Sequence, residues 1–282
     1  MKICACIILY EPDKERLKSN IAAIEKQVDE IFLIDNGSSN VKEIEMLNLE
    51  YNNVSTIFNK ENYGIAYALN QACRKAKSNG YDWILTLDQD SVCPENMVQN
   101  TKKYLDIEHI GIVAPRVFYE GWHNKDSYSS SIEEVNACMT SASLTNISAW
   151  EKVGGFCEEY FIDYVDNEFC MKLRIHGFKI LRNNKCIFHH QLGVSKQKKI
   201  LGYHYNYSIH SPQRVYYMTR NNLMFIKQYS MYISCFKEYL KLIYVILSNI
   251  VFSDEKFKTL KYILLGINDY KKKKLGKCEW SI

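Results

Sequence analysis

The chain has 282 residues, of which 47% are hydrophobic and 13% aromatic. This length and composition suffice to bury the core of one large domain or two small ones, and they exclude a disordered chain. With 12 glycines, 4 prolines and no evident repeat, the sequence also argues against collagen-like and solenoid proteins. The formal charge of +4 is too slight to indicate a nucleic-acid partner, although the excess of lysine is concentrated near the C-terminus.

The ten cysteines occur singly, without the paired spacing of a zinc motif, and several lie inside apolar runs. We therefore expect reduced thiols and a cytoplasmic protein. The apolar stretch from Ile3 to Tyr10 meets Glu11-Pro12-Asp13 at once and has no cleavage site, so a secretion signal is not expected.

Short apolar runs alternate with helical segments over the first 118 residues. The runs predict strands at Ile3–Tyr10, Ile31–Ile34, Val54–Phe58, Trp83–Leu87 and Ile110–Phe118. One helix, begun near Pro12-Asp13, is predicted by the spacing of Leu17, Ile21, Ile24 and Val28. A second is predicted by the apolar positions Ile65, Ala68, Leu69, Ala72, Cys73 and Ala76, with Asn79-Gly80 as its end.

This alternation predicts an α/β fold of βαβ units, with a mostly parallel sheet covered by helices on both faces. Such sheets bind ligands beyond the carboxyl ends of their strands. The polar segments that follow the predicted strands are Tyr10-Glu11, Asp35-Asn36-Gly37-Ser38, Asn59-Lys60-Glu61-Asn62-Tyr63-Gly64 and Asp88-Gln89-Asp90-Ser91. A Gly-rich phosphate loop is missing, which argues against dehydrogenases and P-loop enzymes.

Two acidic segments follow strands, and each has a structural and a functional interpretation. Asp88 and Asp90 are two residues apart, so both carboxylates can point the same way at the rim and hold Mg²⁺ or Mn²⁺ beside substrate phosphates. A turn that leaves the strand is the alternative. Asp35 is predicted either to cap the Asn36-Gly37 turn or to contact a nucleotide base or ribose, and alone the turn is favoured.

The segment from Phe161 to Gly177 predicts a helix that begins among acidic residues and ends at glycine. Asp166 is predicted either as the N-cap of this helix or as a general base that takes a proton from an attacking hydroxyl. Upstream, Ser148-Ala149-Trp150-Glu151 is a capping-box pattern, which predicts a helix that starts at Ser148.

Basic and imidazole side chains follow later in the chain. His189 and His190 end an apolar run, which predicts either a core histidine or a metal ligand. Ser211-Pro212 predicts a helix start. The helix would carry on one face the residues Arg214, Tyr217 and Asn221, with Arg220 beside them. These donors could grip a diphosphate, or form a solvated basic face.

Taken in order, the motifs resemble those of a GT-A glycosyltransferase of family 2. The matching segments are Tyr10-Glu11-Pro12, Asp35-Asn36-Gly37-Ser38, Asn62-x-Gly64-x-Ala66-x-x-x-Asn70, Leu87-Asp88-x-Asp90-Ser91 and Asp163-x-x-Asp166-x-Glu168-Phe169. With His189-His190-Gln191-Leu192-Gly193 they are most similar to bacterial rhamnosyltransferases that build O-antigen or capsular polysaccharide. The resemblance spans about residues 1–230. The choice of rhamnose as the donated sugar rests on analogy with those enzymes alone.

The resemblance implies an inverting transferase that uses a nucleoside-diphosphate sugar, dTDP-rhamnose or a UDP-sugar, and a divalent cation. It implies roles for Asp35 on the base, Asp88 near the ribose or phosphates and Asp90 on the metal, with His190 or His189 completing the coordination. Asp166 falls at the position of the catalytic base. Glu168 is expected to be catalytic with it, but it stands where many relatives have a second Asp, so the longer side chain would reach acceptor hydroxyls differently. The expected nucleotide-sugar contacts are Tyr10, Glu11, Asp35, Asn36, Asn62, Gly64, Asn70, Asp88, Gln89, Arg214, Tyr217 and Arg220.

We expect a transferase domain over 1–230 and a C-terminal helical segment over 231–282. The apolar stretch near its start is interrupted by Lys237, Glu238 and Lys241, so it is too short to cross a bilayer. The lysines that follow predict either peripheral contact with an anionic membrane face, where a lipid-linked acceptor would lie, or packing on the domain or on a second copy of the chain.

Two other classes of function compete with sugar transfer. A nucleotidyltransferase shares the sheet and an acidic pair, but it would need a Gly- and Arg-rich loop after the first strand, where this chain has Glu11-Pro12-Asp13-Lys14. A non-catalytic binding module, in which the acids only cap turns and helices, predicts no metal-stimulated hydrolysis of a nucleotide sugar.

Overall fold

The computed structural model describes residues 1–119, 130–190, 195–200 and 203–279. These residues form two compact units. The first comprises Met1–Phe118, Lys125–Phe161 and Val165–His190, and the second comprises Tyr119–Asn124, Ile162–Tyr164 and Gln191–Ile282. The predicted boundary at residue 230 differs from this division, because the helix over Pro212–Tyr229 packs with the two helices that follow it.

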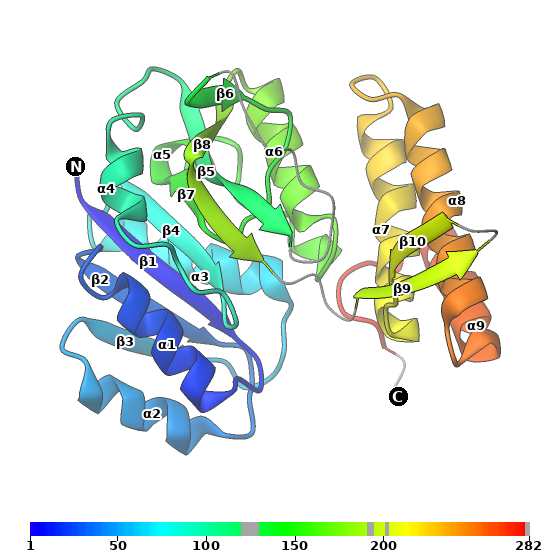
Figure 1. Cartoon of the computed structure of the whole chain (residues 1–282), viewed down its shortest axis with the longest axis horizontal. Helices are drawn as coiled ribbons and strands as arrows, with labels where there is room; N and C mark the ends of the chain where they lie inside the picture. Colours follow the sequence, from blue (N-terminus) through cyan, green and yellow to red (C-terminus); the bar gives the residue numbers. More distant parts are fainter. Residues whose placement is uncertain (120–129, 191–194, 201–202, 280–282) are drawn as a thin grey trace. The chain divides into compact units, whose positions relative to one another are not determined.

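The first unit is built on one mixed sheet with strand order β3-β2-β1-β4-β7-β5-β8-β6 (Figure 1). The strands are β1 (Ile3–Leu9), β2 (Glu30–Asp35), β3 (Val54–Phe58), β4 (Trp83–Asp88), β5 (Ile110–Tyr119), β6 (Ile132–Glu134), β7 (Ser143–Asn146) and β8 (Lys179–His190). The first four pair in parallel, and β7 runs antiparallel to β4 and β5. The five predicted strands are confirmed: β3 has the predicted bounds, and no end of the others differs by more than one residue.

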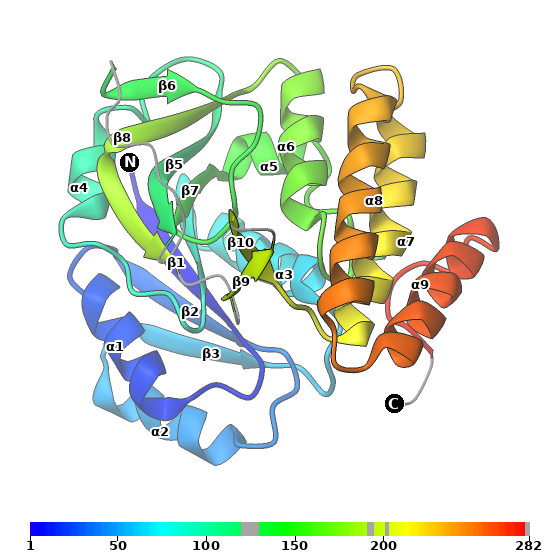
Figure 2. The ribbon, with the colours of Figure 1, turned by 45° about the vertical axis from the view of Figure 1, so that its right-hand side comes forward.

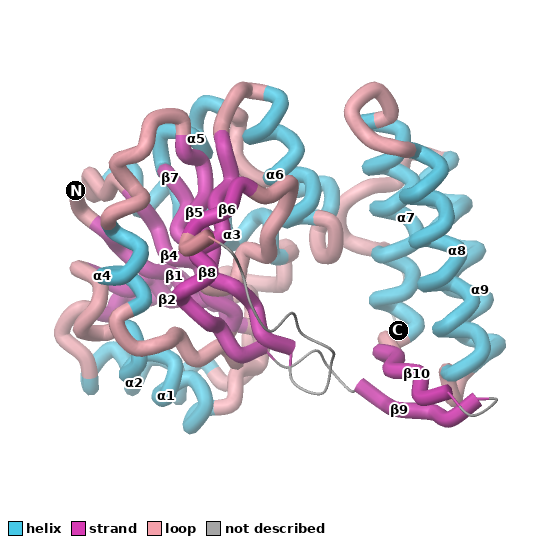
Figure 3. Tube along the Cα trace, turned by 45° about the horizontal axis from the view of Figure 1, so that its top comes forward, coloured by secondary structure: helices cyan, strands magenta, loops and turns pink. Residues whose placement is uncertain are grey.

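The helices of this unit are α1 (Lys14–Ile24), α2 (Val41–Glu50), α3 (Ile65–Ser78), α4 (Met97–Lys102), α5 (Ile147–Lys152) and α6 (Val165–Ile175), with a 3₁₀ turn η1 (Glu158–Tyr160). Odd-numbered residues of β1, such as Ile7, join one core cluster with α1, α2 and α4. Helix α3 packs against β1, β2 and β4. Figure 3 shows the strands with helices on both sides, as the α/β prediction required.

Two local predictions were wrong. Helix α1 begins after Asp13, which caps it as expected, but it ends at Ile24, and Val28 packs on the core from the turn beyond. The capping box at Ser148 does not form. Asn146 is the N-cap of α5 instead, because its side chain already accepts the N–H of Ala149 at 3.0 Å.

The second unit contains a hairpin and three helices. Strands β9 (Ser195–Ile200) and β10 (Tyr203–Ser208) pair antiparallel. Helix α7 (Pro212–Tyr229) packs closely along α9 (Lys256–Lys271), and α8 (Cys235–Phe252) lies against both (Figure 2). Ser211 caps α7 with proline at its first position, as predicted. Among the helices of the described residues, none combines the length and the hydropathy needed to cross a bilayer.

Candidate active site

The turn after β4 carries two acids at the rim of the sheet. The backbone N–H of Asp88 donates to Ser141 Oγ at 3.1 Å, and its carbonyl accepts from Ser91 N at 3.1 Å and from Asn20 Nδ2 at 2.9 Å. Asp88 is partly exposed, whereas Asp90 is exposed and uses its backbone carbonyl to accept from Arg16. Backbone groups therefore make the turn, and Asp90 is exposed, while the metal-ligand interpretation stays a prediction.

The segment after β1 is tied to the turns on both sides of it. The N–H of Tyr10 donates to Gln89 Oε1 at 2.7 Å. Glu11 accepts from Ser39 N and Oγ, both at 2.8 Å, through its carboxylate. Tyr10 keeps half of its side-chain surface exposed. Glu11 is exposed as well, but its carboxylate holds the neighbouring turn.

Asp35 lies under the turn after β2 rather than on an open surface. It is fully buried, and its carboxylate accepts from Gly37 N at 3.3 Å, from Ser38 N at 3.2 Å and from Ser38 Oγ. The turn interpretation describes this arrangement, and the contact of Asp35 with a nucleotide base stays a prediction. The local reason is the positive φ of Gly37, which folds the loop back over the acid.

Asn36, Asn62 and Gly64 connect the second and third strand ends. Asn36 Nδ2 donates to Asn62 Oδ1 at 3.0 Å and to the carbonyl of Gly64 at 3.1 Å. Gly64 has a φ of 93°, and a Cβ there would lie 2.6 Å from the ring of Phe161. The N–H of Ile65 donates to the carbonyl of Phe161 at 2.7 Å. These residues therefore fix the start of α3 against the segment that leads to α6.

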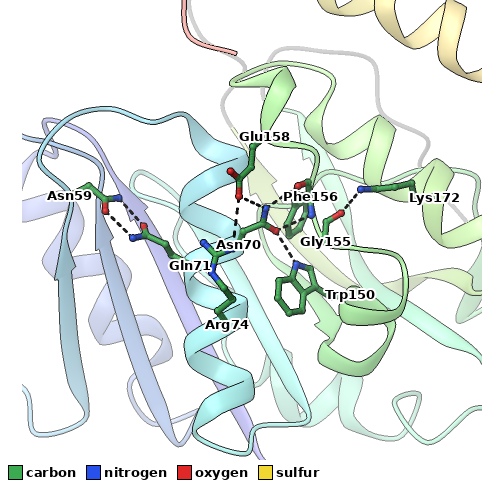
Figure 4. Close-up of polar contacts among 9 residues, drawn as sticks. All are labelled: Asn59, Asn70, Gln71, Arg74, Trp150, Gly155, Phe156, Glu158 and Lys172. Atoms are coloured by element: carbon green, nitrogen blue, oxygen red, sulfur yellow. Dashed lines mark hydrogen bonds and ion pairs between the residues drawn. The ribbon is translucent and has the colours of Figure 1, made fainter. Parts of the chain in front are cut away.

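Asn70 is a predicted ligand contact whose side-chain amide is bound within the protein. Its amide oxygen accepts from Trp150 Nε1 at 3.0 Å and from Phe156 N at 2.9 Å, and its nitrogen donates to the Phe156 carbonyl and to Glu158 (Figure 4). All four positions of the amide are occupied. Because Asn70 lies nearly two turns into α3, it joins that helix to the chain after α5, and its role in this structure is structural.

Asp166 lies in the first turn of α6, and a two-residue bridge connects it to the acids of β4. The hydroxyl of Thr140 donates to Asp166 Oδ1. The next residue, Ser141, accepts the N–H of Asp88 and contacts Ser91 Oγ at 2.9 Å. Since neighbouring Cα atoms are about 3.8 Å apart, the general-base candidate and the Asp88–Asp90 turn belong to one site.

Thr140 and Ser141 are the site residues that sequence reasoning missed. Both are nearly buried and lie just before β7, which enters the sheet antiparallel between β4 and β5. The signal was present as a run of small polar residues, Thr140-Ser141-Ala142-Ser143, before an apolar position. The importance of this run depends on the insertion of β7 between β4 and β5, which no local sequence pattern predicts.

Glu168 does not share the setting of Asp166. It is 1% exposed, and its Oε2 lies 3.4 Å from Lys172 Nζ, which also donates to the carbonyl of Gly155 (Figure 4). Two residues along an α-helix turn a side chain by roughly 200°, so Glu168 faces the interior when Asp166 faces the rim. In this structure Glu168 pairs with Lys172 of its own helix, and Lys172 joins α6 to the loop at Gly155, so the acceptor contact of Glu168 stays a prediction.

The two adjacent histidines point to opposite faces of β8, as successive strand residues do. The ring of His189 packs on Phe118 with centroids 5.1 Å apart. His190 is partly buried; burial lowers its pKa, and the negative charge of Asp90 opposes that shift. His190 is therefore the histidine that shares the surroundings of the β4 acids, while Gln191-Leu192-Gly193 of the same motif lie outside the described residues.

The donor set at this rim fits a divalent cation. Asp88 and Asp90 offer oxygen ligands, and His190 offers a neutral imidazole, the form that binds metals. Within the described residues, no three His, Cys, Asp or Glu side chains gather closely enough to hold an ion on their own.

The polar residues of α7 bind partners within their own unit. Arg214 donates to Asp163 at 3.1 and 3.2 Å, and Tyr217 accepts the N–H of Cys278 at 2.9 Å. Arg220 is fully buried, lies over the rings of Tyr216 and Tyr217, and donates to the carbonyl of Gly276 at 2.8 Å. Its setting is neither the solvated basic face nor an open phosphate site.

Comparisons with known proteins agree with this geometry. The structure matches S. aureus TarS residues 1–349 in complex with UDP-GlcNAc at a TM-score of 0.60 and 15% identity, over 96% of this chain and 80% of that one. It matches GalNAc-T7 with UDP, GalNAc and Mn²⁺ at a TM-score of 0.62 and 14% identity, over 80% and 48% of the two chains. The fold is therefore that of the GT-A glycosyltransferases.

The sequence comparisons then give the family. The family model described as glycosyl transferase family 2 matches residues 4–161. The dTDP-rhamnosyl transferase RfbF of Shigella flexneri is 29% identical over 245 residues, covering 80% of each chain. The chain belongs to glycosyl transferase family 2, and it is a glycosyltransferase that uses a nucleotide-sugar donor.

Proposed function

We propose that the enzyme transfers L-rhamnose from dTDP-rhamnose to a hydroxyl of a polysaccharide or lipid-linked acceptor, with inversion at the anomeric carbon. The observation that carries the mechanism is the Thr140–Ser141 bridge between Asp166 and the Asp88–Asp90 turn. It brings a candidate general base and a candidate phosphate site into one rim, which is what a single displacement requires.

Asp166 is the proposed general base. Its carboxylate takes the proton of the acceptor hydroxyl while that oxygen forms a bond to the anomeric carbon, and the bond to the diphosphate oxygen breaks with its electron pair leaving on the nucleotide. The hydroxyl of Thr140 donates to Asp166 Oδ1, which orients the carboxylate. One displacement inverts the centre, so no covalent sugar–enzyme intermediate is needed.

Asp88, Asp90 and His190 are the proposed ligands of Mn²⁺ or Mg²⁺. When bound, such an ion neutralises charge on the diphosphate leaving group. The protein's own part is to fix the two acids in a turn anchored to α1 through Arg16 and Asn20, and to Ser141 through the Asp88 N–H. Tyr10 and the open edge of Asp88 are the remaining surfaces for the nucleotide.

The choice of rhamnose rests on the relative from Shigella flexneri, whose printed name is dTDP-rhamnosyl transferase. A UDP-sugar is the alternative donor, since the similar fold of TarS holds UDP-GlcNAc. Differential scanning fluorimetry with dTDP-rhamnose, UDP-glucose and UDP-GlcNAc, with and without Mn²⁺, separates these donors. Of the three donors, only dTDP-rhamnose is expected to raise Tm, and only when Mn²⁺ is present. The absence of a response to any of the nucleotides would contradict the proposal.

The histidines give a matched pair for the same assay. His190→Ala is expected to weaken the metal-dependent response, because it removes a ligand beside Asp90. His189→Ala is expected to leave that response unchanged, because its ring packs on Phe118 instead. Equal losses in both variants would argue against the ligand set.

A further inference from the structure

Helix α8 presents an apolar face to solvent. Its members are exposed and recur every three or four positions along the helix: Phe236, Leu240, Ile243, Tyr244, Leu247 and Val251. We call this set the α8 face. Phe236 is 73% exposed and Tyr244 64%. Exposed apolar patches of this extent are uncommon on proteins that remain free in water, so the face indicates a partner.

The helix is held in place by its opposite side. Of α8, which lies wholly within the described residues, Leu242 and Asn249 are the two buried side chains. Asn249 Oδ1 accepts the N–H of His210 at 3.1 Å. A surface helix normally buries its apolar stripe and exposes polar residues. Here the packed side includes an asparagine and the outward side is apolar, so packing within the unit does not account for the α8 face.

Lysines outnumber acidic residues in the C-terminal segment that contains the α8 face, although Lys241 pairs with Glu238 on α8. From residue 231 to the C-terminus the sequence has ten lysines and five acidic residues, so this segment carries all of the chain's net positive charge. Lys237 and Lys241 are exposed on α8 itself. The exposed side of α9 repeats the combination, with Phe257 and Leu264 among exposed lysines such as Lys261.

We propose that the α8 face docks on an anionic lipid surface, with α8 lying in the plane of the interface. Apolar side chains enter the boundary between headgroups and acyl chains, and the lysines remain at the level of the lipid phosphates. Charge decides between this occupant and a second copy of the chain. A symmetric pairing through α8 would bring lysine-rich surfaces together, whereas an anionic bilayer attracts each of them.

The experiment is flotation of the full-length protein with vesicles of phosphatidylcholine, with or without phosphatidylglycerol. Binding to the anionic vesicles is expected. The double variant Leu240→Gln/Leu247→Gln should weaken it by about a hundredfold, because each buried leucine contributes roughly tenfold. The matched control is Met46→Gln/Leu49→Gln on α2, since both residues are also exposed apolar helix positions, and it should bind as the wild type does.

The contribution of lysine charge to vesicle binding is tested with Lys237→Glu, and Lys42→Glu on α2 is the control. Near an anionic surface one lysine contributes about fivefold, and reversal of its charge should cost more than that. Equal binding of the wild type to neutral and anionic vesicles would overturn the proposal. So would a wild-type dimer that the leucine variant converts to a monomer without any vesicle binding, because the face would then belong to a second copy.

Two further readouts keep the result interpretable. Because the substituted leucines are exposed, the variant should keep its Tm within about 2 °C, and a large fall would mean that the face is covered in the protein itself and would overturn the proposal. Donor hydrolysis measured without lipid tests the proposed sugar transfer separately. Loss of vesicle binding with intact hydrolysis therefore reports on the α8 face alone.

Discussion

The sheet rim and helix α7 both carry the polar residues that sequence motifs single out, but they use them differently. At the rim, backbone groups and small side chains such as Ser141 make the turns, so that Asp90 and part of Tyr10 stay open. On α7, Arg214 and Arg220 both turn to partners in their own unit. A polar residue on a packed helix can thus be part of the interior, as Arg220 is, while Asp90 in the turn after β4 stays exposed.

The largest expected effect is at the rim. Asp166→Asn should lower kcat for transfer by roughly 10²–10⁴-fold, because the amide cannot accept the acceptor proton. Donor affinity should not change. The exposed neighbour Asn167 provides the control, since Asn167→Ala leaves the carboxylate in place. Steady-state kinetics of transfer measure kcat, and isothermal titration measures the affinity for the donor. A fall in donor affinity without a fall in kcat would show that Asp166 is not the general base.

On α7, the expected effect falls on folding. Arg220→Met should lower the free energy of unfolding by about 3 kcal/mol and Tm by roughly 10 °C, because it leaves the buried Tyr216 hydroxyl and Gly276 carbonyl without their donor. Arg74→Met removes an exposed arginine with a loose partner, Glu158 at 3.8 Å, and should change Tm little. A stable Arg220→Met protein that loses donor affinity would instead place Arg220 in the ligand site.

An effect on stability of similar size is expected at the contact of Gly64 with Phe161. Gly64→Ala should cost about 3 kcal/mol of stability, since the new methyl group meets Phe161 and φ is far from the range of alanine. Gly80→Ala is the control, because Gly80 also has a positive φ but open space around it, and it should cost about 1 kcal/mol. Thermal unfolding of both variants checks the difference. Equal costs would mean that the close approach to Phe161 is easily relieved.

The smallest expected effect concerns the bridge. Thr140→Val removes the hydroxyl that orients Asp166 and should lower kcat about tenfold, which corresponds to roughly 1.4 kcal/mol. Thr145→Val is its match, because the buried hydroxyl of Thr145 finds no partner among the described residues. That variant should keep its activity and its Tm. Equal losses of activity would assign the effect to general packing rather than to Asp166.

Much of the fold followed from periodicity. Buried parallel strands are continuous apolar runs, so β1 to β5 could be placed from the sequence, and the stripe of α3 was regular enough to give both of its ends. The start of α5 was wrong because Asn146 and Ser148 are both good caps, and only the end of β7 decides between them. The outward apolar side of α8 was not predictable, since a pattern shows a stripe but not which way it faces.

The candidate site was predicted in part for a similar reason. Asp88, Asp90 and Asp166 could be named because strand ends and helix starts place them at a rim, and the structure links them through Thr140 and Ser141. The sequence could not show which of the other candidate residues are buried. Glu168 is an acid in the same short motif, yet the rotation of the helix turns it to Lys172. Local sequence predicts where a residue lies along a helix or strand, whereas tertiary packing determines the direction in which its side chain points.

The segment just before α6 limits how freely the C-terminal helices can be exchanged in evolution or engineering. Phe161, Asp163 and Tyr164 all have positive φ, a conformation that non-glycine residues adopt only when neighbours hold them. Asn221 supplies part of that hold through the carbonyls of Ile162 and Asp163. Recombining α7 to α9 with those of a homologue would therefore disturb the backbone three residues before Asp166, and the two parts of the chain should be exchanged together or left together.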